Sequence, residues 1–187
     1  MIILSIQLTT KEKMLLQDQK AQEELCVKKY QDYSNKAQDP QLKQLFSSLS
    51  QKEQEHLNSI NQILSGQIPN VQQSQQMGQQ MQPGKQAQMQ ASMGSQMAGQ
   101  ASSQMSNQGS SQGSSQGSSQ GSSLNDSSLC SDMLSTEKFV SGTYNTAIFE
   151  CTNTNIRQVL NHIQKEEQEH GEQLFNYMQS KGMYSVQ

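Results

Sequence analysis

An internal repeat constrains this 187-residue chain more than any other feature of its sequence. When the sequence is shifted by 114 residues, which is the distance from Glu53 to Glu167, its two end parts align without a gap. The tetrapeptide that begins at Glu53 recurs identically at Glu167, reading Glu-Gln-Glu-His in both copies. Polar positions match outside the tetrapeptide as well, because Glu23 aligns with Glu137. A repeat at a fixed period predicts that one structural unit occurs twice.

Each copy of the repeat has the pattern of a helical hairpin. The predicted helices cover about 10–37, 39–66, 131 or 132–151, and 154–180. Thr10, Asp39 and Asn153 are the predicted N-caps, Pro40 suits a first helical position, and Gly182 is placed to stop the last helix. Apolar residues recur at helical spacing in each hairpin. We therefore expect an all-α protein, in which the two hairpins bury their apolar faces together as one four-helix bundle.

A low-complexity segment separates the two copies. Residues 66–127 consist largely of Gln, Ser, Gly and Met and repeat Gly-Ser-Ser-Gln. Such a composition predicts a disordered linker between an N-terminal hairpin at 8–65 and a C-terminal hairpin at 128–184. A coil of that length has a root-mean-square span of roughly 43 Å, enough to join opposite ends of a bundle. Its composition also favours self-association.

Composition and charge exclude several classes of function. There are 13 Lys and Arg residues against 16 Asp and Glu, with no basic cluster, which argues against nucleic-acid binding. No stretch approaches the ~20 apolar residues of a membrane-spanning helix. The first residues carry no pattern of a signal peptide, so we expect synthesis in the cytoplasm without one. Three scattered cysteines without a Cys-x-x-Cys motif suit a reducing compartment.

Four glutamates and two histidines lie where the apolar stripes predict core residues. Glu53 and His56 continue the stripe of their helix one turn apart, and Glu167 and His170 do the same in the second copy. Glu23 and Glu137 lie on the stripes of the two partner helices. Burying unpaired carboxylates costs several kcal/mol each. Four of them together therefore predict a bound cation.

Counting from the hairpin turns predicts that these residues share one level. Glu23 and Glu53 lie 15 residues on either side of position 38, and Glu137 and Glu167 lie 15 on either side of position 152. In an antiparallel pair, equal distances from the turn give equal heights, here about 22 Å at 1.5 Å per residue. Pairing the hairpins would then gather the predicted metal ligands in one layer: Glu23, Glu53, His56, Glu137, Glu167 and His170.

These six residues form a known pattern, in which two helices each contribute one Glu and the other two each contribute Glu-x-x-His. This is the pattern of carboxylate-bridged dinuclear proteins. Over about 115 residues, this chain resembles the ferritin-like superfamily, rubrerythrins in particular. The resemblance implies that Glu53 and Glu167 bridge two metals, while Glu23 and Glu137 bind one metal each. It also implies one nitrogen ligand from each histidine. Hard oxygen ligands with few nitrogens favour two Fe or two Mn ions.

Several segments of the sequence resemble the clostridial type of Coat F spore coat proteins. The segments are Leu8–Lys13, Gln22–Cys26, Asp39–Lys43 and Tyr177–Tyr184. This resemblance implies a location in the spore coat, with other coat proteins or further copies of the chain as partners. Because the linker is long, the hairpins can also pair between two chains, which would give a homodimer.

Simpler alternatives remain open for individual residues. The histidines and glutamates can form a relict site in which buried pairs replace the metal. Tyr30 and Tyr144 can orient ligand carboxylates through hydrogen bonds or serve only as core aromatics. Cys26 is more simply a small core residue, and His162 is interpreted as a surface residue.

The function itself is open between two classes. A structural coat protein is the first hypothesis, and a peroxidase-, catalase- or oxidase-like redox enzyme that protects against peroxide is the alternative. Whether the chain is an enzyme stays undecided at this point.

Overall fold

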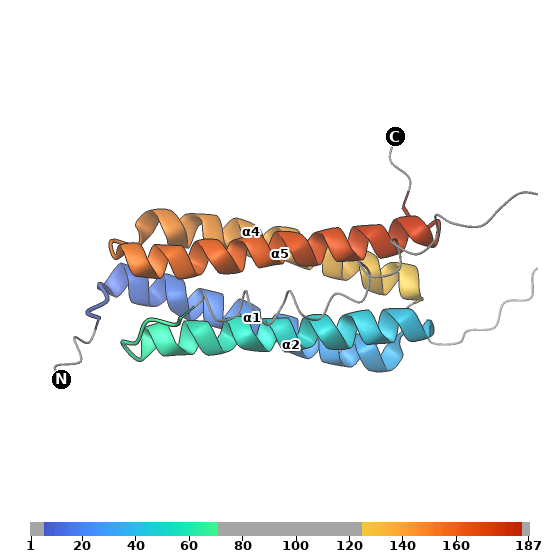
Figure 1. Ribbon diagram of the computed structural model, residues 1–187, viewed down its shortest axis with the longest axis horizontal. Helices are drawn as coiled ribbons and strands as arrows, with labels where there is room; N and C mark the ends of the chain where they lie inside the picture. Colours follow the sequence, from blue (N-terminus) through green and yellow to red (C-terminus); the bar gives the residue numbers. More distant parts are fainter. Residues whose placement is uncertain (1–5, 71–124, 185–187) are drawn as a thin grey trace, which may run out of the picture. The chain divides into compact units, whose positions relative to one another are not determined.

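The structure is a computed structural model that describes residues 6–70 and 125–184. Most of the predicted low-complexity linker lies outside these residues. The described part is all-helical, with four α-helices and no strand. They are α1 (Thr10–Lys36), α2 (Pro40–Leu64), α4 (Asp126–Glu150) and α5 (Thr154–Ser180), shown in Figure 1. None of the described helices is both long and apolar enough to cross a lipid bilayer.

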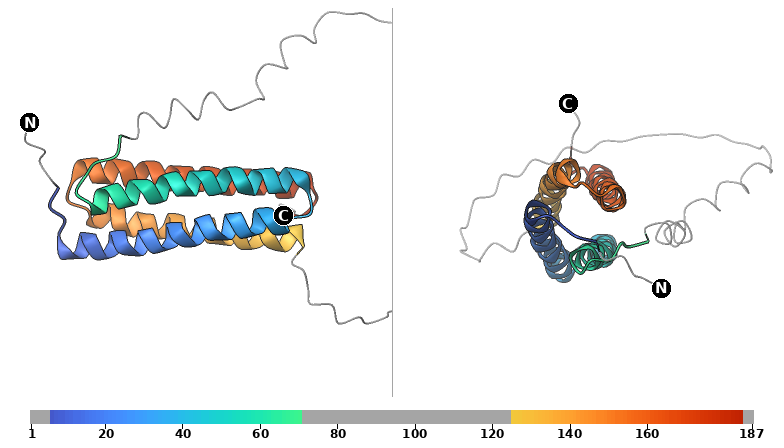
Figure 2. Two further views of the ribbon diagram at one scale, coloured as in Figure 1. Left: turned by 90° about the horizontal axis from the view of Figure 1, so that it is seen from below. Right: turned by 90° about the vertical axis from the view of Figure 1, so that its left-hand side faces the viewer.

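The helices pack side by side along their lengths (Figures 1 and 2). α1 runs antiparallel to α2, and α4 runs antiparallel to α5. α1 also packs against α4, while α2 and α5 make fewer contacts with each other. The end of α2 lies beside the start of α1, where the Ile6 amide donates to the Gly66 carbonyl at 3.2 Å. The start of α4 lies at the opposite end of the bundle, so the connection from α2 to α4 joins the two ends.

The helix boundaries confirm some of the predicted caps and correct others. Asp39 and Asn153 cap α2 and α5, as predicted. The cap of α1 is Thr9 and not Thr10, because Thr9 and Glu12 form a reciprocal capping box. α4 begins at Asp126, with Asn125 as its cap, several residues before the predicted start. The helix extends further because Asn125 satisfies the amide of Ser128.

With this corrected start, Asp132 lies inside α4, where it faces α1. Its carboxylate pairs with the Lys29 ammonium at 2.6 Å and accepts a hydrogen bond from the Tyr33 hydroxyl at 2.7 Å. Both contacts join α1 to α4.

Two acids, the buried Glu12 and the half-buried Asp126, hold the hairpins together at opposite ends. Glu12, in the first turn of α1, accepts hydrogen bonds from the backbone amide and the hydroxyl of Thr152, in the turn between α4 and α5. Asp126, in the first turn of α4, accepts from the amides of Gln38 and Asp39, at the turn between α1 and α2. Glu12 and Asp126 are 114 residues apart, so the repeat offset relates them.

The apolar core is divided into two clusters with a polar layer between them. One cluster is built around Leu16, Ile60 and Ile163, and the other around Phe46, Met133 and Leu174. On α2 the apolar stripe passes from Leu49 to Ile60 and is interrupted by a buried Glu and a buried His. On α5 the stripe is interrupted in the same way. The apolar clusters therefore fix the helix registers on both sides of the polar layer.

Candidate metal centre

The six predicted ligands are all buried in the layer between the two apolar clusters. Each is at most 2% exposed. They form two overlapping groups, within each of which one possible ligand atom per residue lies within 4.8 Å of the others. The groups are Glu23, Glu53, His56 and Glu167, and Glu53, Glu137, Glu167 and His170. Glu53 and Glu167 belong to both groups.

Glu53 and Glu167 are shared by the two ligand groups, and each histidine contacts the shared glutamate of the other hairpin. His56 Nδ1 lies 2.9 Å from Glu167 Oε1, and His170 Nδ1 lies 2.8 Å from Glu53 Oε1. The two imidazole rings stack with their centroids 5.4 Å apart. Every one of these contacts joins α2 to α5. The layer therefore exists only when both hairpins are packed together.

Two buried tyrosines also cross between the hairpins. The Tyr30 hydroxyl of α1 donates a hydrogen bond to Glu137 of α4, and the Tyr144 hydroxyl of α4 donates to Glu23 of α1. Both tyrosines are fully buried. The sequence left two roles open for these tyrosines, as orienting groups or as core aromatics only. The contacts favour the role in which the hydroxyls orient carboxylates. Each tyrosine holds the glutamate of the opposite hairpin, although the glutamate of its own helix is nearer in sequence.

The pKa values of the layer reflect an excess of negative charge. Burial raises the pKa of Glu23 and of Glu167 well above the usual range, and the Glu53 carboxylate adds to both shifts. Burial also opposes ionisation of Glu53, but interactions with His170 and His56 outweigh it and lower its pKa. Burial lowers the pKa of His56, yet hydrogen bonds to Glu166 and Glu167 raise it well above its usual value. The layer therefore disfavours full ionisation of its four carboxyl groups.

The remaining oxygen atoms of the four carboxylates fit a bound cation. One oxygen of each, Oε2, is buried and has no hydrogen-bond partner among the described residues. An unsatisfied buried carboxylate oxygen is costly. A relict site would explain the buried Glu–His pairs, but these four oxygens would stay unsatisfied in it. The donor set of carboxylate oxygens and two imidazoles suits Fe or Mn.

Sequence reasoning missed a fifth acidic residue at this layer. Glu166 lies off the apolar stripe of α5, but it is half-buried and its Oε2 lies 3.0 Å from His56 Nε2. The same oxygen lies 3.3 Å from Nε2 of His162. His162 was expected on the surface, but the structure shows it half-buried. A ligand histidine often bonds a carboxylate through its second nitrogen. The repeat offers no such partner for His170, since Lys52 occupies the matching position.

The three cysteines are free and buried within the apolar clusters. Cys26 is fully buried, as expected of a small core residue, and burial raises its pKa far above the usual range. Burial raises the pKa of Cys130 to about 12. Cys130 lies near the predicted linker, but its burial argues against a crosslinking role.

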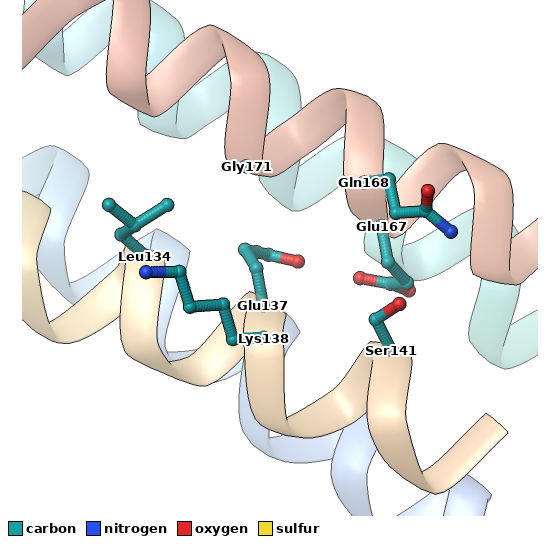
Figure 3. Close-up of a pocket in the computed structure, with 7 residues that line it drawn as sticks. All are labelled: Leu134, Glu137, Lys138, Ser141, Glu167, Gln168 and Gly171. Atoms are coloured by element: carbon teal, nitrogen blue, oxygen red, sulfur yellow. The ribbon is translucent and has the colours of Figure 1, made fainter. Parts of the chain in front are cut away.

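A pocket on the α4–α5 side reaches the acidic layer (Figure 3). Its volume is about 360 Å³. Figure 3 shows the Glu137 and Glu167 side chains pointing toward each other from the two helices. The other lining residues are Leu134, Lys138, Ser141, Gln168 and Gly171. Two of the six predicted ligands therefore lie on the wall of a pocket.

Comparison with known proteins relates the second hairpin to a known family. Residues 125–187 match the family model of the Coat F domain. The match covers α4 and α5 and includes the second Glu-x-x-His. No curated protein and no solved structure matches the chain.

Proposed function

We propose that this chain is a structural protein of the spore coat, of the clostridial Coat F type, whose helical bundle holds a carboxylate-bridged dinuclear metal site. The Coat F domain at residues 125–187 supports the coat function and a location in the spore coat. It also agrees with other coat proteins, or further copies of this chain, as partners. Coat deposition explains why a compact helical bundle would carry a long Gln- and Ser-rich insertion.

The bundle is proposed to be ferritin-like and built from two duplicated hairpins. Its support is the symmetry of the contacts across the repeat offset. Glu12 and Asp126 tie the two turns in the same manner, and Tyr30 and Tyr144 bond opposite glutamates in the same manner. The connection between opposite ends of the bundle also agrees with that topology.

The single observation that carries the metal proposal is the set of four buried, unsatisfied carboxylate oxygens around two imidazoles. Glu53 and Glu167 would bridge the two ions, because they belong to both ligand groups. Glu23 and His56 would complete one position, and Glu137 and His170 the other. When bound, Fe or Mn would supply Lewis-acid and redox chemistry. Tyr30 and Tyr144 would hold the two outer carboxylates in place.

Elemental analysis of the purified chain tests the metal proposal. We expect about two Fe or Mn ions per chain, one for each ligand group. Glu53→Gln keeps the size of a bridging side chain but removes its charge, so it should abolish stoichiometric binding. Glu55→Gln, a neutralisation at an exposed position on the same helix, is the matched control and should bind like the unsubstituted chain. A folded chain that contains no metal after purification and binds none when Fe or Mn is added would refute the site.

A redox enzyme that removes peroxide is the second candidate, and the pocket at Glu137 and Glu167 favours it. A purely structural metal site does not need a solvent-accessible opening, whereas a reactive one does. Peroxide consumption by the metal-loaded chain, compared with Glu53→Gln, distinguishes the two candidates. Consumption that depends on Glu53 would support the enzyme, and its absence in a fully loaded chain would leave only the structural role.

The segment between the hairpins is proposed to serve self-association in the coat. Limited proteolysis tests its exposure, since an accessible linker should be cut while both hairpins survive. The oligomeric state of the cleaved protein tests hairpin exchange between chains. A homodimer with exchanged hairpins would fall to the mass of a single bundle after cleavage, because only the two linkers join its two bundles, whereas a monomeric bundle would keep the same mass throughout.

A further inference from the structure

The two hairpins differ at the seam between their helices, despite the repeat. In the second hairpin, Gly171 and Ser141 line the pocket that reaches Glu137 and Glu167. The repeat offset matches Gly171 with Leu57 and Ser141 with Val27. Both matching residues are larger and apolar, Val27 is buried and Leu57 is half-buried. The pocket therefore lies where one copy of the repeat has small residues and the other has large ones.

The inner end of the pocket is formed by two carboxyl groups, each of which has one oxygen without a hydrogen-bond partner. Glu137 is 1% exposed and Glu167 is fully buried, and both line the pocket. The Oε2 atom of each has no hydrogen-bond partner among residues 6–70 and 125–184. Figure 3 shows these two carboxyl groups between α4 and α5. Two buried acceptors thus belong to residues of the pocket wall.

The outer end of the pocket is open to solvent. Lys138 and Gln168 line it and are both exposed, whereas Leu134 and Ser141 are half-buried. One water needs only ~10–15 Å³ of such volume, so about 360 Å³ admits a small ion with part of its hydration shell. The pocket therefore extends from bulk water to the wall of the acidic layer.

We propose that the α4–α5 seam is the route by which divalent metal ions reach the buried layer, and that Gly171 and Ser141 keep it open. This inference rests on the proposed metal site. A hydrated cation would pass Gln168 and Ser141 and exchange waters for the free oxygens of Glu137 and Glu167. Lys138 lies at the opening, and its positive charge repels approaching cations and so slows their entry.

Gly171 is the position at which the route can be closed. A Cβ atom added there would lie 3.7 Å from Leu134 Cδ1 and 4.0 Å from Glu137 Cβ, which is ordinary van der Waals contact. The backbone of α5 therefore accepts a side chain at this position without a clash. A longer side chain would extend into the pocket. Gly171→Leu gives the second hairpin the residue that the first one has, and Ser141→Val does so on the opposite wall.

The rate of metal uptake tests the route. The full-length chain, freed of metal with a chelator, is mixed with excess Co²⁺, and the appearance of the bound-Co²⁺ absorption is followed by stopped flow. Gly171→Leu should slow uptake about tenfold, which corresponds to a barrier increase of about 1.4 kcal/mol. The final stoichiometry should not change, since no ligand is removed. Gly142→Leu is the matched control, because a Cβ there meets nothing within 4 Å, and its rate should equal that of the unsubstituted chain.

Further measurements make each outcome decisive. Circular dichroism verifies the fold of each variant, and if Gly171→Leu fails to fold, Ser141→Val must slow uptake for the proposal to stand. Equal uptake rates in folded Gly171→Leu and in the unsubstituted chain would overturn the route while leaving the metal site intact. If the unsubstituted chain binds no Co²⁺ at equilibrium, the proposed metal site fails, and the route fails with it.

Discussion

Glu12 offers the sharpest test of how the two hairpins are joined. Its side chain is 1% exposed, and its carboxylate accepts hydrogen bonds from the Thr9 amide, the Thr152 amide and the Thr152 hydroxyl. Burial opposes ionisation of Glu12, but the hydrogen bonds from Thr152 and Thr9 outweigh it and lower the pKa from 4.5 to about 2. A charged carboxylate at this position therefore stabilises the fold.

The size of this contribution follows from the shift in pKa. A shift from 4.5 to about 2 is worth about 3 kcal/mol of unfolding free energy at neutral pH, at about 1.36 kcal/mol per unit. Because the folded pKa is the lower one, the contribution is complete above pH 4.5 and is lost as the pH falls toward 2. At pH 3 about 1.4 kcal/mol of it remains. We expect Glu12→Gln to lower stability by up to about 3 kcal/mol at pH 7 and by clearly less at pH 3.

Urea denaturation of the metal-free full-length chain measures this difference. Removing metal with a chelator keeps the acidic layer in the same state in both proteins, so its own pH dependence cancels in the comparison. Glu24→Gln is the matched control, because Glu24 is exposed on the same helix and pairs only with Lys20 at 3.6 Å. The control should change stability by less than about 0.5 kcal/mol. A loss from Glu12→Gln that is equally large at pH 7 and pH 3 would refute the reasoning.

Three further predictions concern the buried polar layer and the thiols. Tyr30→Phe should destabilise the chain by about 1–3 kcal/mol, as measured by urea denaturation, because the buried Glu137 carboxylate loses its hydrogen-bond donor. Tyr33→Phe, at a more exposed site, is the control and should cost less than about 0.5 kcal/mol. Glu167→Gln should stabilise the metal-free chain by about 1 kcal/mol at pH 7, because burial and the Glu53 carboxylate raise the pKa of Glu167 and so make folding with this acid less favourable. The same variant should lose metal, whereas Glu169→Gln, at an exposed position, should leave both stability and metal content unchanged. A thiol reagent should modify none of the three cysteines in the folded chain and all three in urea, as counted by absorbance or mass spectrometry.

Much of the candidate site could be predicted because helix geometry converts spacing into position. Counting residues from the turn between α1 and α2 placed Glu23 level with Glu53, and the same count placed Glu137 level with Glu167. The structure gathers all four in one layer. This prediction needs only the rise per residue and an antiparallel turn, and both are local properties of the chain.

The partners of these residues could not be predicted, because they depend on how one hairpin is rotated against the other. Nothing in the spacing indicates that Tyr30 bonds Glu137 and not Glu23 on its own helix. The contact of Glu166 with His56 was missed for a related reason, since Glu166 lies off the apolar stripe and reaches the site only from the neighbouring helix. The early start of α4 was missed because Asn125 follows a Ser-rich stretch that conceals its role as a cap.

The sequence alone determined which residues recur at the offset of 114 residues. It also determined that they lie on helices and at what distance from the hairpin turn each one lies. Those quantities follow from periodicity along one chain segment. The tertiary structure decided which atoms meet across the hairpins, that Glu12 and Asp126 tie the turns, and that only small side chains separate solvent from Glu137 and Glu167 between α4 and α5. These features depend on the relative rotation and spacing of packed helices, which side-chain packing sets in three dimensions.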